Sequence, residues 1–188
     1  MIYVDERVDE LDIGASLAAV SQQRREQALK YYHESGQKLC IAAYLLLMEG
    51  LHYEYGIVEP PVFEYSANGK PFIASHPDIH FNLSHSANVA LCALSSQPVG
   101  ADVETPRQVS SSLIDYTMSD EEKAKINSSR NPALCFLSFW TKKEALLKLT
   151  AEGINNEMKD VLCRADNYII ETVITKSYVY SIAKYKYN

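Results

Sequence analysis

The stretch VGADVE at Val99–Glu104 decides the fold, because it alternates apolar and acidic residues near the middle of the chain. Successive side chains of a β-strand point to opposite faces, so the apolar residues are predicted to share one face. Asp102 and Glu104 then share the other face, roughly 6–7 Å apart at about 3.3 Å per residue. The pattern predicts a strand that carries two neighbouring carboxylates.

Two explanations fit this acidic pair. Asp102 and Glu104 could lie on the solvated outer face of an edge strand, where charged side chains are ordinary. Alternatively, a hard divalent cation such as Mg²⁺, which takes oxygen ligands, could offset their repulsion. The strand alone does not decide between a surface feature and a metal site.

The stretch FWTKKEALLK, Phe139–Lys148, follows about forty residues later and has a helical pattern. At 100° per residue, one side of this helix is apolar, and Lys143 falls in the middle of that side. Glu144 and Lys148 share its border, one turn apart. The apolar residues of this side are Phe139, Trp140 and Leu147.

A lysine on the apolar side of a helix has two explanations. The stem of Lys143 could pack on Trp140 while its ammonium reaches water. The other explanation is that the helix covers a site for an anionic ligand, with Lys143 and Lys148 beside its phosphates. If the helix packs on the VGADVE strand, Glu144 supplies a third carboxylate to the same Mg²⁺.

The segment FNLSHS, Phe81–Ser86, offers a second group of polar residues. Alternation places Phe81 and Leu83 inside, with Ser84 on the other face and His85 where the strand ends. Ser84 and His85 could donate to a phosphate, although His85 could equally be structural or exposed. Adjacent residues do not form a nucleophile–base pair and no elbow motif is present, so a hydrolase is not indicated.

The remaining pattern predicts helices and strands in two successive sets. The first set comprises a strand over 1–9, helices over Leu17–Tyr32 and Lys38–Leu51 with a break at Ser35-Gly36, and strands at Val62–Tyr65, Ile79–Leu83 and Val89–Leu94, with a tight turn at Asn68-Gly69. The second set comprises the strand at Val99–Glu104, a short helix capped at Ser119, a long helix from Asn131-Pro132 to about Thr150 with Gly153 just past its end, and two or three strands over Val161–Tyr187.

This order predicts an α+β fold of two similar halves, residues 1–101 and 102–188, forming one compact unit. In both halves the helices are followed by strands, and the chain shows no short repeat or low-complexity segment. The 188 residues suffice for one large domain or two lobes that share a core.

Composition excludes several classes of function. The net charge of −6 and the pI of about 5.4 are unsuited to general nucleic-acid binding, which needs a basic face. The first residues lack the apolar run of a signal peptide, and no stretch is long enough to span a bilayer. The four cysteines show no zinc-binding spacing and are expected to be core residues in a reducing cytoplasm.

Taken in order, four motifs resemble those of the 4′-phosphopantetheinyl transferases, in their monomeric, surfactin-type branch. These motifs are GKP at 69–71, FNLSHS, VGADVE and FWTKKEALLK, and the clear resemblance runs from about Gly69 to Gly153. The resemblance implies two similar α/β halves related by a pseudo-twofold axis, with the active site in the cleft between them. It also implies a monomeric cytoplasmic enzyme that acts on coenzyme A and an apo acyl, peptidyl or polyketide carrier protein.

The implied reaction moves the phosphopantetheine arm of coenzyme A onto a serine of the carrier and releases 3′,5′-ADP. By resemblance, Asp102, Glu104 and Glu144 hold Mg²⁺ against the pyrophosphate, and Glu144 also acts as base. Lys148 and Lys143 stabilise the pyrophosphate charge. The phosphate-binding residues implied for the first half are Lys70, Ser84 and His85.

One basic residue of the family pattern stays unassigned. Lys38, Arg24, Arg25 and Lys30 are all candidates for the contact with the 3′-phosphate of coenzyme A. Two other functions also stay open at this point. One is a catalytically silent relative that only binds coenzyme A or a carrier protein, and the other is an unrelated α+β interaction module.

Overall fold

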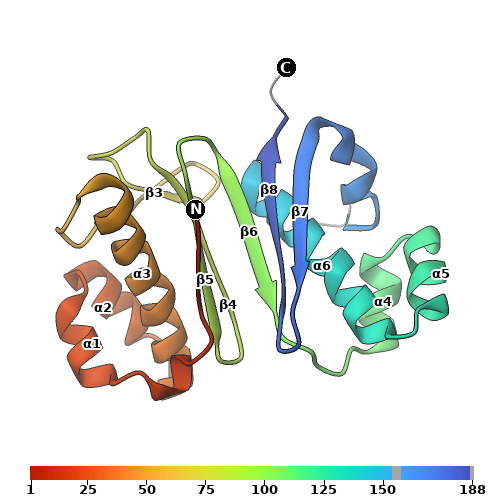
Figure 1. Ribbon diagram of the computed structural model, residues 1–188, viewed down its shortest axis with the longest axis horizontal. Helices are drawn as coiled ribbons and strands as arrows, with labels where there is room; N and C mark the ends of the chain where they lie inside the picture. The colour runs from red at the N-terminus through yellow and green to blue at the C-terminus, as the bar shows by residue number, and fades with distance from the viewer. Residues whose placement is uncertain (154–157, 187–188) are drawn as a thin grey trace. The chain divides into compact units, whose positions relative to one another are not determined.

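The computed structural model describes residues 1–153 and 158–186, so Tyr187, the predicted end of the last strand region, lies outside the described residues. The chain divides into two compact units, Met1–Pro98 and Val99–Asn188 (Figure 1). Among the helices of the described ranges, none combines the length and the apolar character needed to cross a membrane.

Unit 1 contains a three-stranded antiparallel sheet with β5 (Val89–Ser95) at its centre. The neighbours of β5 are β1 (Ile2–Asp5) and β4 (His80–Ser86). Residues 89–94 are all buried, and this explains why the strand has a continuous apolar run rather than an alternating pattern.

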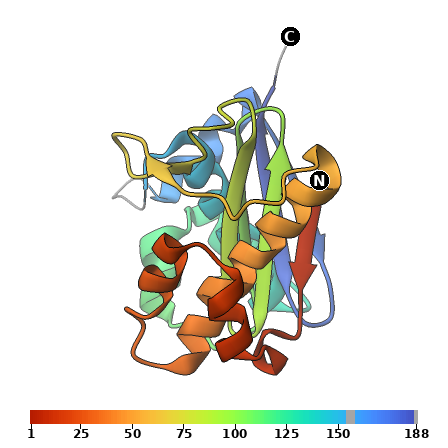
Figure 2. The ribbon, with the colours of Figure 1, turned by 90° about the vertical axis from the view of Figure 1, so that its left-hand side faces the viewer.

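One face of this sheet is covered by the helix α3 (Glu34–Tyr55), which packs on β5 and β4. The shorter helices α1 (Ile13–Ala19) and α2 (Gln22–Ala28) pack against α3, and a 3₁₀ turn, η1 (Val8–Glu10), precedes them (Figure 2). The core between the sheet and the helices contains Ile41, Tyr44, Leu47, Leu51, Phe63, Ile73 and Phe81.

A small hairpin completes unit 1. The strands β2 (Glu64–Tyr65) and β3 (Pro71–Phe72) pair in antiparallel fashion. The predicted tight turn at Asn68-Gly69 is confirmed, because Gly69 has a φ of +78° and its N–H donates to the carbonyl of Ser66 at 2.9 Å. Glycine adopts this left-handed conformation without the steric cost that a side chain brings.

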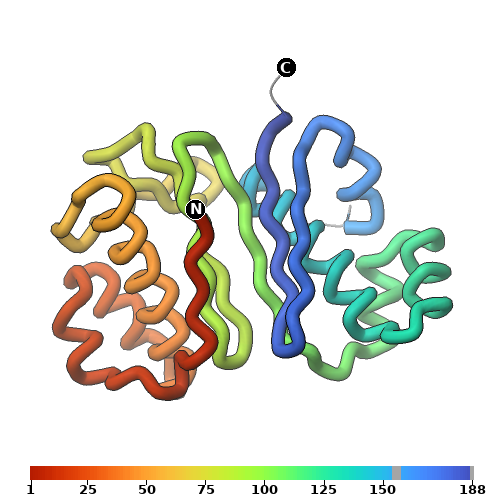
Figure 3. The backbone as a smooth tube through the Cα atoms, viewed as in Figure 1, coloured from red at the N-terminus to blue at the C-terminus, as the bar shows by residue number. Residues whose placement is uncertain are grey.

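Unit 2 contains a second three-stranded antiparallel sheet, in the order β6-β8-β7. The predicted strand at 99–104 is confirmed as β6 (Val99–Glu104), and β7 (Tyr168–Ile174) turns back into β8 (Val179–Tyr185), as the tube in Figure 3 shows. The long helix α6 (Pro132–Thr150) packs on this sheet, and the short helices α4 (Ser111–Thr117) and α5 (Asp120–Ser128) precede it. A 3₁₀ segment, η2 (Met158–Asn167), lies between α6 and β7.

The predicted helix boundaries in unit 2 are confirmed by their caps. The Ser119 side chain accepts from the backbone N–H of Glu122, whose own side chain accepts from the N–H of Ser119, as a capping box requires. The Asn131 side chain caps α6, and Pro132 occupies the first turn, where no N–H is needed.

Two helix predictions in unit 1 are wrong. The predicted helix over Leu17–Tyr32 is two helices, because Val20 is extended and the Ser21 side chain starts α2 by accepting from the N–H of Arg24. The predicted break at Ser35-Gly36 lies instead inside the first turn of α3. The break falls at residues 29–33, between Leu29 and the N-cap His33.

Three further predictions need correction. The first strand ends at Asp5 rather than at residue 9, and the helix α4 was not predicted. The segment predicted as strand from Val161 begins as 3₁₀ helix and becomes strand only at Tyr168. In this 3₁₀ segment only Met158 and Val161 are buried, and the residues Val, Ile, Tyr and Thr on which the strand prediction rested belong mostly to β7 and β8.

The mixed α+β class is confirmed, with a third, two-stranded sheet in the β2–β3 hairpin. The pseudo-twofold similarity of the halves, their boundary at 101/102 and a cleft between them stay predictions.

The tightest packing in unit 2 lies between β6 and α6, at Gly100. A Cβ at this position would fall on the carbonyl oxygen of Ala145 and would lie 2.5 Å from the amide nitrogen of Leu149. The backbones of strand and helix therefore touch at a point where only glycine fits. This contact fixes the distance between the strand that carries Asp102 and the helix that carries Glu144.

We expect Gly100→Ala to destabilise the protein by about 3 kcal/mol or more, because the obstructing atoms belong to the backbone and cannot rotate away. Urea unfolding measures the change. Gly14→Ala is a matched control, since the nearest atom to its added Cβ lies 3.4 Å away and the position is in helix α1. The control should be neutral or slightly stabilising, and equal effects of the two substitutions would contradict the close contact.

Candidate active site

Two carboxylates of β6 face α6, as the alternation of the strand predicts. Gly100 contacts α6, and the period of two places Asp102 and Glu104 on the same face. Asp102 is buried at 5% exposure and Glu104 is partly buried. Both side chains accept hydrogen bonds from residues of α6, so they are not the solvated outer face of an edge strand.

Asp102 forms an ion pair with Lys148, whose Nζ lies 2.6 Å from Oδ1 of Asp102. The Lys148 side chain keeps 31% of its surface exposed, whereas that of Asp102 keeps 7%. The lysine therefore neutralises a buried carboxylate and still reaches the protein surface. It is placed to contact an anion outside the protein at the same time.

Glu104 is held by two groups of unit 2. Its Oε1 accepts from the indole Nε1–H of Trp140 at 3.2 Å and lies 3.6 Å from a guanidinium nitrogen of Arg107. The indole is a donor with one fixed direction, so it orients this carboxylate. The role of Trp140 as an orienting group was not predicted, since helical spacing suggested only an apolar contact.

Glu144 lies next to both acidic residues and is itself 9% exposed. Burial, first, and the charges of Asp102 and Glu104 together raise the pKa of Glu144 to about 7, against the opposing effect of Lys148. Its Oε1 is buried and has no hydrogen-bond partner within residues 1–153 and 158–186. A carboxyl group with a pKa near neutrality can take up and release a proton at physiological pH.

The donor set fits Mg²⁺ by its chemistry. The three carboxylates lie within electrostatic range of one another, and one of them has a buried oxygen that lacks a hydrogen bond. Such a group of oxygen ligands favours the binding of a hard divalent cation. In their present rotamers, no three His, Cys, Asp or Glu side chains of the described ranges form a group that could hold a metal ion. Asp102 is instead engaged with Lys148, and Glu104 with Trp140.

Lys143 occupies a different place from the one predicted. Its side chain is 0% exposed, so its ammonium neither reaches water nor lies free beside a ligand. The Nζ donates to the carboxylate of Glu122 at 2.6 Å and to the carbonyls of Thr117 and Met158 at 2.7 and 2.8 Å. Burial lowers the pKa of Lys143, and the ion pair with Glu122 opposes that change. This position does not fit the predicted role beside phosphates.

The predicted phosphate-binding residues of unit 1 separate into two groups. Ser84 is buried, whereas the following His85 is exposed, because neighbours in β4 point to opposite faces of the sheet. His85 lines a hollow of 210 Å³ together with Leu83 and Arg24, and Ser84 is not among the lining residues. The structure therefore brings His85, rather than the Ser84–His85 pair, to this hollow.

Lys70 lies at the start of β3, and its backbone N–H donates to the side chain of Ser66 at 3.1 Å. Burial lowers the pKa of Lys70 to about 8. The Lys70 charge contributes to the lowered pKa of His80, after the larger effect of burial, so the two side chains are electrostatic neighbours. A partly desolvated ammonium is a favourable partner for an anionic ligand.

Two of the four candidate basic residues line a pair of hollows of unit 1 that share Arg24. Arg24 lines the hollow that contains His85 and also a second one of 320 Å³, where Lys30 joins it. The Arg24 guanidinium lies 4.9 Å from the ring of Tyr44 and 5.1 Å from that of Phe63, which holds the side chain in place.

The other two candidates are engaged elsewhere. Lys38 donates to the carbonyl of Asp9 at 2.9 Å and pairs with Glu34, and it lines a separate hollow. Arg25 donates to the carbonyl of Leu17 at 2.7 Å. The geometry favours Arg24, which lines one hollow with His85, and Lys30, which lines the second hollow with Arg24.

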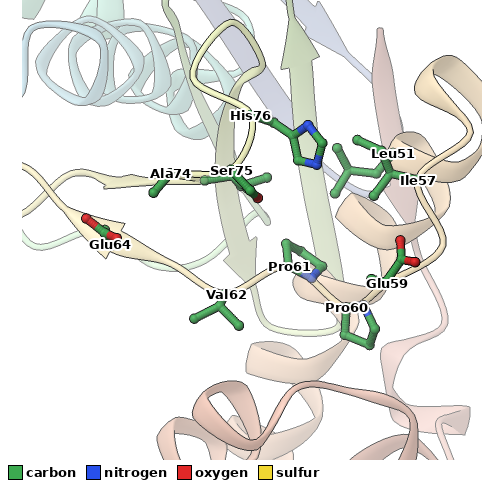
Figure 4. Close-up of a pocket in the computed structure, with 11 residues that line it drawn as sticks. Leu51, Ile57, Glu59, Pro60, Pro61, Val62, Glu64, Ala74, Ser75 and His76 are labelled. Atoms are coloured by element: carbon green, nitrogen blue, oxygen red, sulfur yellow. The ribbon is translucent and has the colours of Figure 1, made fainter.

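A further hollow of unit 1, with a volume of 440 Å³, lies beside the β2–β3 hairpin (Figure 4). Its walls include Pro60, Pro61 and His76, and the acidic residues Glu59 and Glu64 are at its border. The described residues that line it include no lysine and no arginine, so it suits an anionic ligand poorly.

Comparison with known proteins finds similarity over the same part of the chain. A family model described as the 4′-phosphopantetheinyl transferase superfamily matches residues 98–184, the segment that contains Asp102, Glu104, Glu144 and Lys148. The chain belongs to this superfamily. The matched range includes both β6 and α6.

Curated relatives extend the match into unit 1. The chain is 26% identical to the 4′-phosphopantetheinyl transferase Sfp of Bacillus subtilis over 157 residues, which cover 82% of this chain and 70% of the relative. It is 28% identical to the transferase psf-1 of Bacillus pumilus over 148 residues, 77% of this chain and 64% of the relative. It is 32% identical to the transferase HetI of a Nostoc species over 155 residues, 73% of this chain and 62% of the relative.

We expect Glu144→Gln to stabilise the metal-free protein at pH 8. The folded state raises the pKa of Glu144 from an ordinary 4.5 to about 7, so ionising this group costs stability as pH rises through that window. Glutamine removes the cost, which has a ceiling of about 3 kcal/mol. Urea unfolding with EDTA should show the gain at pH 8 and none at pH 4.

Glu152→Gln is the matched control for this measurement. Glu152 is exposed, follows α6 directly and pairs with Arg164 at 3.1 Å on the surface. Its substitution should change the free energy of unfolding little at either pH. A Glu144→Gln variant that is less stable than the parent protein at pH 8 would contradict the raised pKa.

Proposed function

We propose that this protein transfers the 4′-phosphopantetheine arm of coenzyme A to a serine of an apo acyl or peptidyl carrier protein, in a Mg²⁺-dependent reaction that releases 3′,5′-ADP. One observation carries the proposal. Strand β6 and helix α6 gather Asp102, Glu104, Glu144 and Lys148 in one place, with Nζ of Lys148 2.6 Å from Asp102. Membership of the superfamily supports it.

Three carboxylates are proposed to hold the cation, namely Asp102, Glu104 and Glu144. Bound there, Mg²⁺ would neutralise the pyrophosphate of coenzyme A and favour displacement at its β-phosphorus. The orientation of Glu104 by Trp140 supports this role, because a ligand that is already oriented loses less entropy when it binds the ion.

Glu144 is proposed to accept the proton of the carrier serine, directly or through a water molecule. The serine oxygen forms a bond to phosphorus, the bond from that phosphorus to the oxygen of the 3′,5′-ADP group breaks, and the serine proton passes to Glu144. A pKa near 7 suits a base at neutral pH. The nucleophile comes from the carrier, so this chain needs none of its own.

Lys148 is proposed to stabilise the charge on the leaving phosphate. Its ammonium pairs with Asp102 and keeps part of its surface exposed, so it can donate to a phosphate oxygen from the protein surface. Since phosphoryl transfer depends on placement and charge neutralisation, a fixed ammonium contributes directly to the rate.

Coenzyme A is proposed to bind unit 1 through its phosphates. Arg24, Lys30 and His85 would contact the 3′-phosphate, and Lys70 would contact a second phosphate. An arginine whose guanidinium packs against two aromatic rings is a well-oriented donor for such an anion. Ser84 is left as a buried residue of β4 in this proposal.

Transfer is tested by intact-mass spectrometry of an apo carrier protein incubated with coenzyme A and Mg²⁺. The parent protein should add one phosphopantetheine group, and EDTA should abolish the addition. Glu144→Gln should lower kcat by at least about 100-fold, as expected for loss of a general base and metal ligand. Glu152→Gln should leave the rate unchanged. Coenzyme A binding without any transfer to acyl or peptidyl carriers would favour a silent relative instead.

We expect Arg24→Met to raise KM for coenzyme A by about 10-fold or more, because one charge-assisted hydrogen bond to the 3′-phosphate is lost. Methionine retains the stem that packs near Tyr44 and Phe63. Dephospho-coenzyme A lacks the 3′-phosphate, so its KM should not change.

Arg25→Met serves as the control, since Arg25 donates to the carbonyl of Leu17 and does not line the hollows near His85. A similar rise in KM for both donors would show that Arg24 acts elsewhere than on the 3′-phosphate.

A further inference from the structure

Lys143 joins four segments of unit 2 at one atom. Its Nζ, on α6, contacts the carboxylate of Glu122 on α5, the carbonyl of Thr117 at the end of α4 and the carbonyls of Met158 and Lys159 in η2. An ammonium has three donors, and these acceptors satisfy all of them without water. The lysine therefore ties α6 to three neighbouring elements.

The main partner of Lys143 is itself held in place. Oε2 of Glu122 accepts from the N–H of Ser119 at 2.8 Å, and the Ser119 hydroxyl accepts from the N–H of Glu122 at 3.3 Å. This capping box fixes the carboxylate to the first turn of α5, where the partial positive charge of the helix also favours it. Lys143 is thus attached to a rigid point and not to a mobile side chain.

The opposite side of α6 is fixed as well. The backbone at Ala145 and Leu149 touches β6 at Gly100, so the helix cannot move toward the sheet. A contact of that kind limits translation, yet it leaves a rotation of the helix about its axis less restricted. Lys143, with its contacts on α4, α5 and η2, restricts that rotation.

Rotation matters because Glu144 follows Lys143 directly on the helix. Side-chain atoms lie about 6 Å from a helix axis, so a rotation of about 10° moves a carboxylate by about 1 Å. A misplacement of about 1 Å can cost about 100-fold in rate. The position of the Glu144 carboxylate beside Asp102 is accordingly sensitive to whatever holds α6.

We propose that Lys143 is a positioning residue, which through its ion pair with Glu122 fixes the rotation of α6 and thereby places Glu144 beside Asp102 and Lys148. The inference deepens the proposed function and rests on it. It replaces a phosphate contact for Lys143 by an internal role, since the side chain is 0% exposed and its donors are taken.

The energetics of a buried ion pair favour this role over simple stabilisation. Removing an ammonium and a carboxylate from water costs several kcal/mol per ion, and an apolar pair of similar volume is often as stable or more stable. What the ionic pair adds is a single geometry, because Lys143 and Glu122 satisfy one another in one arrangement only. That geometry is useful where the next residue must be placed accurately.

The test uses the double variant Lys143→Met with Glu122→Gln. Methionine keeps the length of the side chain, and glutamine still accepts from the N–H of Ser119, so the capping box survives. We expect a folded protein with kcat lowered by about 10–100-fold and KM for coenzyme A within about 3-fold of the parent value. Direct titration with Mn²⁺, followed by its electron paramagnetic resonance signal, should show about 10-fold weaker binding.

Lys142→Met is the matched control. Lys142 precedes Lys143 on the same helix, and its ammonium lies 5.8 Å from the ring of Phe139 rather than in an ion pair. It should leave kcat and Mn²⁺ affinity unchanged. Should the double variant fail to fold, Glu122→Gln alone retains the lysine and the cap, and it should still lower kcat and Mn²⁺ affinity by about 3-fold or more.

Two results would overturn the inference. The first is a folded variant with the kcat and Mn²⁺ affinity of the parent protein. The second is an unchanged kcat with KM for coenzyme A raised about 10-fold, which would make Lys143 a phosphate contact. If the parent protein transfers nothing, the proposed function fails, and the Mn²⁺ titration by itself decides whether Lys143 positions Glu144.

Discussion

The contact between the backbones of β6 and α6 at Gly100 is the constraint on which the candidate site depends. A side chain at this position would separate the strand from the helix, and the groups that meet across them would lose contact. Lys148 reaches Asp102, and Trp140 reaches Glu104, because the two elements lie at this short distance. The buried position of Glu144 follows from the same packing, and with it the high pKa of that carboxyl group. A residue with no polar side chain of its own thus sets the electrostatics of its neighbours.

Much of unit 2 could be predicted because its signals are local. The alternation in Val99–Glu104 and the caps at Ser119 and Asn131 involve residues close in sequence, and the structure confirms all three. The errors arose where local signals compete. Gly36 suggested a helix break, although a glycine in the first turn of α3 costs little when the rest of the helix is buried. The strand prediction from Val161 began too early because it rested on the β-propensity of the whole region, and the residues that carry this propensity lie mostly from Tyr168 on.

The candidate site was predictable in its carboxylates and less so in its lysines. Strand and helix periods place acidic groups on a face, and that suffices when the two elements pack together. These periods do not show whether the charged end of a long side chain reaches water. The ammonium of Lys143 turns toward Glu122, a partner 21 residues away that no spacing rule selects. Arg24 was one of four equivalent candidates in the sequence, and its place in the hollow with His85 and beside the rings of Tyr44 and Phe63 distinguishes it. Long-range partners decide both cases.

The enclosure of Lys143 also changes how this residue behaves toward chemical reagents. An amine with a lowered pKa is ordinarily a good nucleophile, but an ammonium that is fully enclosed and bonded to one carboxylate and three carbonyls offers nothing to attack. Acylating reagents should therefore label its neighbours Lys142 and Lys148 in the native protein and spare Lys143. Acylation of Lys143, detected in a peptide map, would therefore identify molecules in which α6 has separated from α5.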